Sequence, residues 1–227
     1  RADDFYQLSL LQSKAFDNES AYKSIEQALS KSPDYPIYLL TKVKLALAVK
    51  PDNETQQQIN ELYLKLPRNP NVDLLQGDLW LKQQKLTKAK KFYNKALSLD
   101  PNFDQAISKL YMLANQSIGA KAFANNIERI LKEGNGTSLA RNLLADYYLN
   151  TNQLKKAQIH YEILQTQPIS NKANILNNLA NIYLVNGQSA DLTKAKLLIE
   201  QAIVIQPSSP AFIDTQGWIM AKQGDFK

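Results

Sequence analysis

The stretch GDLWLKQQKLTKAKKFYNKALSLDP, from Gly77 to Pro101, constrains the fold of this chain more than any other. It predicts two short helices joined by a tight turn. Packed helices approach to about 8 to 10 Å only where the side chains at the contact are short, so we expect Gly77 and Ala89 at the crossing. A large residue at Ala89 should cost roughly 1 to 3 kcal/mol by overpacking. Pro101 disfavours a helical conformation at Asp100, so the second helix must end there.

The same landmarks return along the chain with a period of 34 residues. The first occurrence lies two periods before the stretch above, and part of the pattern returns two periods after it. The matching residues are Ala21, Ile25, Ala28 and Pro33; then Ala89, Tyr93, Ala96 and Pro101; then Ala157 and Tyr161.

This spacing resembles the tetratricopeptide repeat (TPR), a 34-residue helix-turn-helix unit with small residues where its helices A and B cross. The resemblance implies an all-α fold, a right-handed α-solenoid of TPR repeats with six full repeats plus one helix A. We therefore expect thirteen helices and no strand. Residues 1–227 should form a single TPR superhelix, with repeats at approximately 2–35, 36–69, 70–103, 104–137, 138–172, 173–209 and a partial 210–227.

Repeats 2 and 4 depart from the pattern at the two small positions. Repeat 2 carries Val43 and Thr55 there, but its apolar spacing still predicts helices over residues 37–49 and 52–66. Repeat 4 carries Tyr111 and Phe123, which should splay its helices and change the local superhelical pitch.

The ends of three further elements can be predicted. Gly134 and Gly136 should end a helix through a left-handed cap. Repeat 6 is three residues too long, and we expect the insertion, residues 188–192, in its A to B turn. Neither end of the array has the polar outer face of a capping repeat, so we expect a part of a longer protein.

The last two repeats resemble a narrower group. NNLANIYLVNG (177–187) and SPAFIDTQGWIMAKQGDF (209–226) are similar to the C-terminal repeats of bacterial envelope TPR lipoproteins of the exosortase (PEP-CTERM) type. That resemblance implies a scaffold that is periplasmic, or membrane-anchored on the periplasmic side. A cytoplasmic location is the alternative, because any signal peptide or lipidated cysteine would lie upstream of Arg1.

Most catalytic chemistry has no support in the sequence. Cysteine is absent, and His160, the only histidine, is expected to be a solvated surface imidazole. No glycine-rich phosphate loop occurs. No stretch approaches the roughly 18 consecutive apolar residues of a membrane span, so no transmembrane segment is expected. We expect no catalytic residue, no metal site and no cofactor, and a function other than that of an enzyme.

The net charge of +6 comes from one stretch. Without its six lysines, the chain has as many basic as acidic residues. We expect these side chains to form a solvated face on the convex surface, where exposed charge adds little stability. The alternative is a polyanion binder that takes nucleic acid, acidic polysaccharide or lipid headgroups, of which nucleic acid is the least expected. The stretch contains Lys82, Lys85, Lys88, Lys90, Lys91 and Lys95.

The aromatic residues fall into two groups. Five recur at repeat positions that face the partner helix, and we expect them in the core: Trp80, Tyr148, Tyr183, Tyr93 and Tyr161. Trp218 differs, because it lies at position 9 of repeat 7, on the helix A face that lines the concave groove of TPR arrays.

That face contains positions 2, 5, 9 and 12 of each repeat, counted from the repeat's first residue. Asparagines gather on it in repeats 5 to 7. An Asn side chain offers a donor and an acceptor, so a row of them can hold the backbone of an extended peptide. The alternative is that helix A tolerates solvated Asn. We expect a protein or peptide partner here, and a homodimer through the open C-terminal repeat is a further possibility. The expected groove residues are Asn142, Asp146, Asn174, Asn177, Asn178, Asn181, Asp214 and Trp218.

Overall fold

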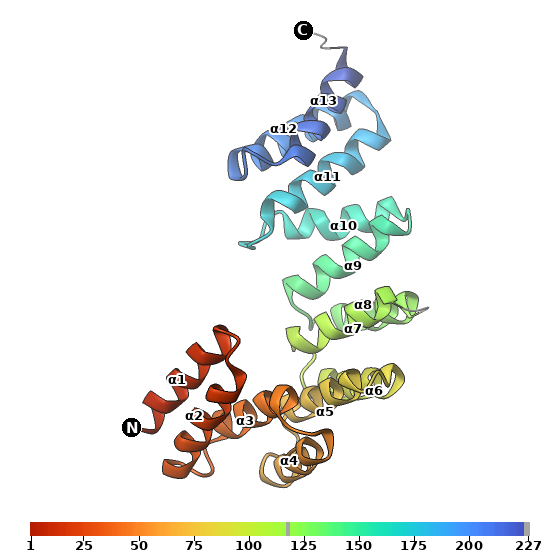
Figure 1. The fold of residues 1–227 in the computed structure, drawn as a ribbon. Helices are drawn as coiled ribbons and strands as arrows, with labels where there is room; N and C mark the ends of the chain where they lie inside the picture. The colour runs from red at the N-terminus through yellow and green to blue at the C-terminus, as the bar shows by residue number, and fades with distance from the viewer. Residues whose placement is uncertain (117–118, 225–227) are drawn as a thin grey trace. The chain divides into compact units, whose positions relative to one another are not determined.

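The computed structural model describes residues 1–116 and 119–224, and within these ranges it contains thirteen α-helices and no strand (Figure 1). Both numbers confirm the prediction from the repeat. The chain divides into two compact units, an N-terminal unit, Arg1–Gly119, and a C-terminal unit, Ala120–Lys227. Phe226, the last residue of the second motif above, lies outside the described residues.

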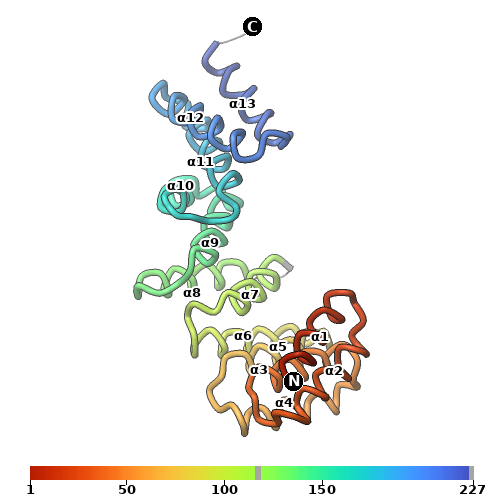
Figure 2. Tube along the Cα trace, turned by 90° about the vertical axis from the view of Figure 1, so that its left-hand side faces the viewer, coloured from red at the N-terminus to blue at the C-terminus, as the bar shows by residue number. Residues whose placement is uncertain are grey.

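Seven helices belong to the N-terminal unit and six to the C-terminal unit, and Figure 2 follows the chain through each. The N-terminal unit contains α1 (Ala2–Lys14), α2 (Asn18–Lys31), α3 (Pro36–Val49), α4 (Asp52–Lys65), α5 (Pro70–Lys82), α6 (Leu86–Leu99) and α7 (Asp104–Gln116). The C-terminal unit contains α8 (Ala120–Lys132), α9 (Ser138–Asn150), α10 (Leu154–Leu164), α11 (Lys172–Asn186), α12 (Ser189–Ile205) and α13 (Pro210–Gln223).

The helix ends follow from local chemistry. The Asp17 side chain accepts a hydrogen bond from the Ser20 backbone N–H and so caps α2, and Thr137 caps α9 in the same way. α6 ends at Leu99, as Pro101 requires. The expected left-handed cap after α8 is confirmed, because both Gly134 (φ 78°) and Gly136 (φ 92°) have positive φ.

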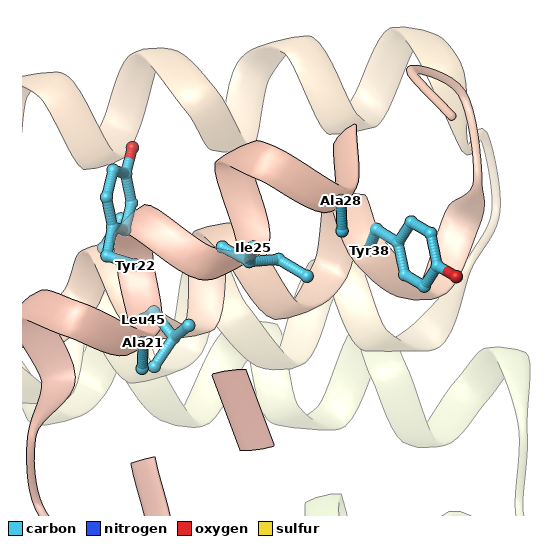
Figure 3. Close-up of a cluster of buried hydrophobic side chains, with 7 residues drawn as sticks. Ala21, Tyr22, Ile25, Ala28, Tyr38 and Leu45 are labelled. Atoms are coloured by element: carbon cyan, nitrogen blue, oxygen red, sulfur yellow. The ribbon is translucent and has the colours of Figure 1, made fainter. Parts of the chain in front are cut away.

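The core consists of helix A and helix B faces packed against their neighbours. Figure 3 shows one such cluster, in which Leu45 lies beside Ala21 at one end and Tyr38 beside Ala28 at the other, with Ile25 between them. α2 and α3 therefore run antiparallel.

The predicted small residues of the α5 and α6 crossing are both in the core. Gly77 and Ala89 are both buried there, and the Tyr93 ring lies directly against Gly77. A Cβ atom on Gly77 would lie 2.4 Å from a ring carbon of Tyr93. Only glycine leaves room for the ring in this position.

Repeats 2 and 4 have large residues where repeat 3 has Gly77 and Ala89. In repeat 2, Val43 and Thr55 are buried, and the Thr55 hydroxyl donates to the carbonyls of Ala46 (3.3 Å) and Pro51 (3.1 Å). In repeat 4, helices α7 and α8 belong to different units, so the boundary between the units falls within this repeat. The change of pitch stays a prediction.

The predicted place of the insertion in repeat 6 was wrong. α12 begins at Ser189 and is 17 residues long, against 14 for α6, so the inserted residues form its first turn. Asp191 in that turn favours the helix N-terminus, and the side chain of Leu192 is buried. Both effects stabilise the inserted residues as a helical turn relative to an extended loop.

Candidate functional site

A groove of about 450 Å³ runs over the helix A faces of the N-terminal unit. The predicted concave positions line it, and its side chains are apolar and polar in about equal number. Leu10 and Ile37 remain 40% and 43% exposed. Lys44 is also exposed, and the structure gives it no acidic partner among the described residues. The lining comprises Tyr6, Ser9, Leu10, Ser13, Asn18, Ile37, Leu40, Thr41, Lys44, Leu45, Ala48, Asn71, Leu74, Leu75, Asp78 and Gln105.

At one end of this groove, Asp78 accepts from two donors. The Tyr93 hydroxyl donates to its carboxylate over 2.7 Å, and the Lys109 ammonium lies 2.7 Å from the same oxygen. Burial and the Asp78 charge both raise the pKa of Tyr93, so the phenol stays protonated and donates. The carboxylate of Asp78 is therefore neutralised within the unit.

The C-terminal unit repeats this arrangement 68 residues later with one change. The Tyr161 hydroxyl donates to Asp146 over 2.5 Å, and the Asn142 amide lies 3.4 Å from the other carboxylate oxygen. Asn178 occupies the position of Lys109, and its amide donates to the Tyr161 hydroxyl over 3.2 Å. Three predicted groove residues, Asn142, Asp146 and Asn178, are thus brought together.

Asp146 differs from Asp78 in its electrostatics. Its carboxylate forms no ion pair with any residue the structure describes. Burial raises the pKa of Asp146, and the hydrogen bond from Tyr161 only partly offsets that rise. The site is therefore a partly buried carboxylate held by neutral donors.

The other predicted groove residues do not join this network. Asn181 accepts a hydrogen bond from the Thr215 hydroxyl at 3.4 Å. The Asn177 side chain is 9% exposed, and its amide oxygen has no hydrogen-bond partner within the described part of the chain. The three others are exposed, Trp218 by 60%: Asn174, Asp214 and Trp218.

The family model for the tetratricopeptide repeat matches residues 74–103. A structure of PilF from Pseudomonas aeruginosa superimposes with a TM-score of 0.62 at 16% identity, covering 95% of this chain and 96% of that one. PilW, described as a widely conserved type IV pilus biogenesis factor, gives a TM-score of 0.59 at 17% identity, with 94% and 97% covered. YrrB, described as a TPR protein with an unusual peptide-binding site, gives 0.54 at 15%, with 85% and 97% covered.

The fold of this chain is a tetratricopeptide repeat solenoid. The identities are low, so the likeness to these three structures concerns the fold. No curated protein matches the sequence significantly.

The structure shows which lysines of residues 82–95 have acidic partners. Two lysines form ion pairs with acids from other helices, Lys82 with Asp52 (2.9 Å) and Lys95 with Asp73 (2.7 Å). Both acids lie outside residues 82–95, so the sequence of that stretch shows no acidic partner for its lysines. Lys91 is exposed and Lys90 half-buried, and neither has an acidic partner among the residues described.

Lys88 has a structural role that recurs. Its ammonium lies 4.3 Å from the centre of the Trp80 ring, and Lys156 lies 4.7 Å from the Tyr148 ring in the same way. In each repeat the aromatic residue is at position 11 and the lysine at position 19. Trp80 was expected in the core and is half-buried, with the ammonium groups of Lys85 and Lys88 over its ring. The other four aromatic residues are buried as predicted, namely Tyr148, Tyr183, Tyr93 and Tyr161.

The expectation for His160 was wrong. Its ring is half-buried, stacks on Tyr148 with the planes 10° apart, and lies 3.3 Å from the Arg141 guanidinium. Burial, followed by the Arg141 charge, lowers the pKa of His160. The ring is therefore a neutral packing element at physiological pH.

Sequence reasoning missed the hydroxyls of Tyr93 and Tyr161 as parts of the concave face. It assigned both rings to the core, where they lie, but did not connect their oxygens to the aspartates. A signal was present, because tyrosine occupies position 24 only in repeats 3 and 5, the two repeats that have aspartate at position 9.

None of the helices in residues 1–116 and 119–224 is long and apolar enough to cross a bilayer. The same residues contain no group of three acidic or histidine side chains placed to hold a metal ion.

Proposed function

We propose that this TPR solenoid is a protein-interaction scaffold that holds extended segments of a partner protein on its concave helix A faces. The groove of about 450 Å³ in the N-terminal unit carries the proposal, because it is lined by side chains at the concave repeat positions of successive repeats. Its apolar side chains and exposed Lys44 suit a segment that alternates apolar and acidic side chains.

The C-terminal unit offers a second surface of different chemistry. Its concave positions carry amides and carboxylates, which suit the polar groups of a peptide backbone. The exposed indole of Trp218 adds a large side chain of the type that most often dominates binding energy. We propose the asparagine-rich face of repeats 5 to 7 as part of the binding surface.

We propose further that this scaffold works in the assembly of a bacterial envelope system, such as exopolysaccharide export or protein sorting. The resemblance of the last two repeats to envelope TPR lipoproteins supports this, as does the shared fold with a type IV pilus biogenesis factor. Fractionation of cells with antibodies against the chain tests it. Recovery in the periplasmic or membrane fraction is expected, and recovery only from the cytoplasm would contradict it.

Site-specific photo-crosslinking tests the concave surface. A photoreactive phenylalanine analogue is placed at Lys44 or at Trp218, with the exposed Lys91 of helix B as the matched control position. Crosslinks to the same partner from positions 44 and 218, and none from 91, are expected. Crosslinks from position 91 alone would place the partner on the convex side and reject the proposal.

A second candidate function, polyanion binding, rests on Lys90 and Lys91. Lys88 and Lys95 are poor test residues because they contact Trp80 and Asp73, so the variant of choice is Lys90→Glu with Lys91→Glu. A polyanion binder should hold heparin in a strongly salt-dependent way and lose it in this variant. Absence of binding at physiological salt would remove this candidate.

A further inference from the structure

We propose that the C-terminal unit binds a basic side chain of the partner segment, an arginine above all, through the Asp146 carboxylate. This deepens the proposed function and rests on it. It names the residue type that the asparagine-rich face selects.

The first argument is a comparison of equivalent positions. In two places along the described chain, position 6 of one repeat contacts position 9 of the repeat before it, and in a third place both residues bond to one tyrosine hydroxyl. Lys109 pairs with Asp78, Thr215 bonds to Asn181, and Asn178 shares the Tyr161 hydroxyl with Asp146. A lysine at 178 would therefore stand where it can reach Asp146. The chain has asparagine there, and the carboxylate is left without a cation.

The second argument concerns acceptors. Asp146 receives one short hydrogen bond, from Tyr161, and a long one from Asn142. A carboxylate has room for about four, so acceptor capacity remains. Next to Asn178 on α11, the Asn177 amide oxygen is buried and has no donor among the described residues. The Asp146 carboxylate thus has acceptor capacity left, and one acceptor on α11 lacks the donor that a buried polar atom normally has.

The third argument is charge and shape. The concave positions of repeats 5 to 7 contain two acids, Asp146 and Asp214, and no basic residue. A guanidinium supplies five N–H donors and a charge, and it fits a carboxylate through two parallel hydrogen bonds. Trp218 presents an exposed ring on α13, two A helices beyond α9, where it is available to another side chain of the same segment.

The test uses two short peptides that differ in one group. An acetylated, amidated pentapeptide with a central arginine is compared with its citrulline analogue, which keeps the shape but has no charge. Binding to the isotope-labelled chain is followed through the side-chain amide signals of Asn142 and Asn178. The expected result is a shift of both signals with the arginine peptide and at least about tenfold weaker binding of the citrulline peptide.

Two variants test whether the Asp146 charge binds the arginine. Asp146→Asn removes the charge, and Asn178→Lys installs the internal cation that the N-terminal unit already has. Each should weaken the arginine peptide at least about tenfold. Asp52→Asn, a control that removes a carboxylate of the other unit outside its groove, should leave binding unchanged. Circular dichroism establishes that the variants are folded.

Three results would overturn the inference. Equal binding of the two peptides would mean that only the backbone is held, which leaves the proposed function intact. Retained arginine binding in both Asp146→Asn and Asn178→Lys would mean that another residue takes the charge. Failure of both peptides to shift either amide at millimolar concentration would reject the arginine site, while crosslinking from Trp218 would still decide the proposed function independently.

Discussion

Asp78 in the N-terminal unit and Asp146 in the C-terminal unit occupy the same repeat position, and each accepts a hydrogen bond from the tyrosine at position 24 of its own repeat. Asp78 also forms an ion pair with Lys109. At the position equivalent to Lys109, the second unit has the neutral Asn178, which donates to the Tyr161 hydroxyl and not to Asp146. One substitution thus separates a carboxylate that is satisfied within the fold from one that retains capacity for an external donor. A repeat array can therefore change its chemistry at one position without altering the packing beneath it.

The largest expected loss of stability comes from displacing the Tyr93 ring, whose hydroxyl donates to Asp78. In Gly77→Leu the new side chain displaces the Tyr93 ring, whose carbon already lies 2.4 Å from an added Cβ. We expect a loss of about 3 kcal/mol of unfolding free energy, at the upper end of overpacking penalties. Urea unfolding measures it, and hydrogen exchange in α5 and α6 locates it.

The control for that variant is Gly217→Leu, at the same repeat position in α13. No atom lies within 4 Å of an added Cβ there, so leucine should be tolerated and should favour the helix by up to about 1 kcal/mol. Similar destabilisation in both variants would show that the loss comes from glycine removal in general.

Removing the tyrosine hydroxyls sharpens the comparison. Tyr161→Phe deprives Asp146 of the short hydrogen bond of 2.5 Å, so we expect a cost of about 2 kcal/mol. Tyr93→Phe should cost about 1 kcal/mol, because Lys109 still compensates Asp78. Chemical denaturation of the two variants compares them directly. A larger loss in Tyr93→Phe would reverse the assignment of the two sites.

Replacing each aspartate by asparagine should change the free energy of unfolding in opposite directions. Asp78→Asn leaves Lys109 unpaired and lowers stability. Asp146→Asn removes a partly buried charge and should raise stability at neutral pH by up to about 1 kcal/mol, limited by the water that still reaches the group.

The pH dependence follows from the raised pKa of Asp146. The folded chain holds this proton to higher pH than the unfolded chain, whose carboxyl titrates near 3.8. Stability from this group therefore falls as pH rises from 3.8 through the folded pKa, and the cost is then constant. Subtracting the Asp146→Asn curve from the wild-type curve isolates this slope. A slope of the opposite sign would contradict the account.

The smallest effect concerns His160, for which repeat 3 has Phe92 at the same position. The folded pKa of His160 is lowered, so the unfolded imidazole, near 6.5, takes a proton first. Stability of the C-terminal unit should fall as pH drops below about 6.5, and His160→Phe should abolish that part of the decline. Thermal unfolding between neutral and mildly acidic pH measures it. An unchanged decline in the variant would assign it to other groups.

The sequence predicted the repeat fold well because its landmarks are local. Gly77, Ala89 and Pro101 fix a crossing and a helix end through sterics that need no knowledge of the rest of the chain. The insertion in repeat 6 was misplaced because loop tolerance was weighed and the burial of Leu192 was not.

The candidate site was predicted in part. Helical periodicity placed Asn142, Asp146 and Asn178 on or at the edge of one face, and the structure joins them. Helical periodicity could not show that the hydroxyl of Tyr161, whose ring was assigned to the core, joins Asp146 to Asn178. Nor could it show that Asp52 and Asp73 neutralise lysines of a stretch that contains no acid, because these pairs form between helices.

The most direct test of the difference between the two sites is the titration of the Asp146 side-chain carboxyl, followed by its carbon NMR signal. The account predicts a pKa above the ordinary 3.8 in the wild-type chain and a lower pKa in Asn178→Lys, where an ammonium would stand beside the carboxylate as Lys109 does beside Asp78. A wild-type pKa at or below 3.8, unmoved by Asn178→Lys, would show that Asp146 is already compensated and would contradict the account.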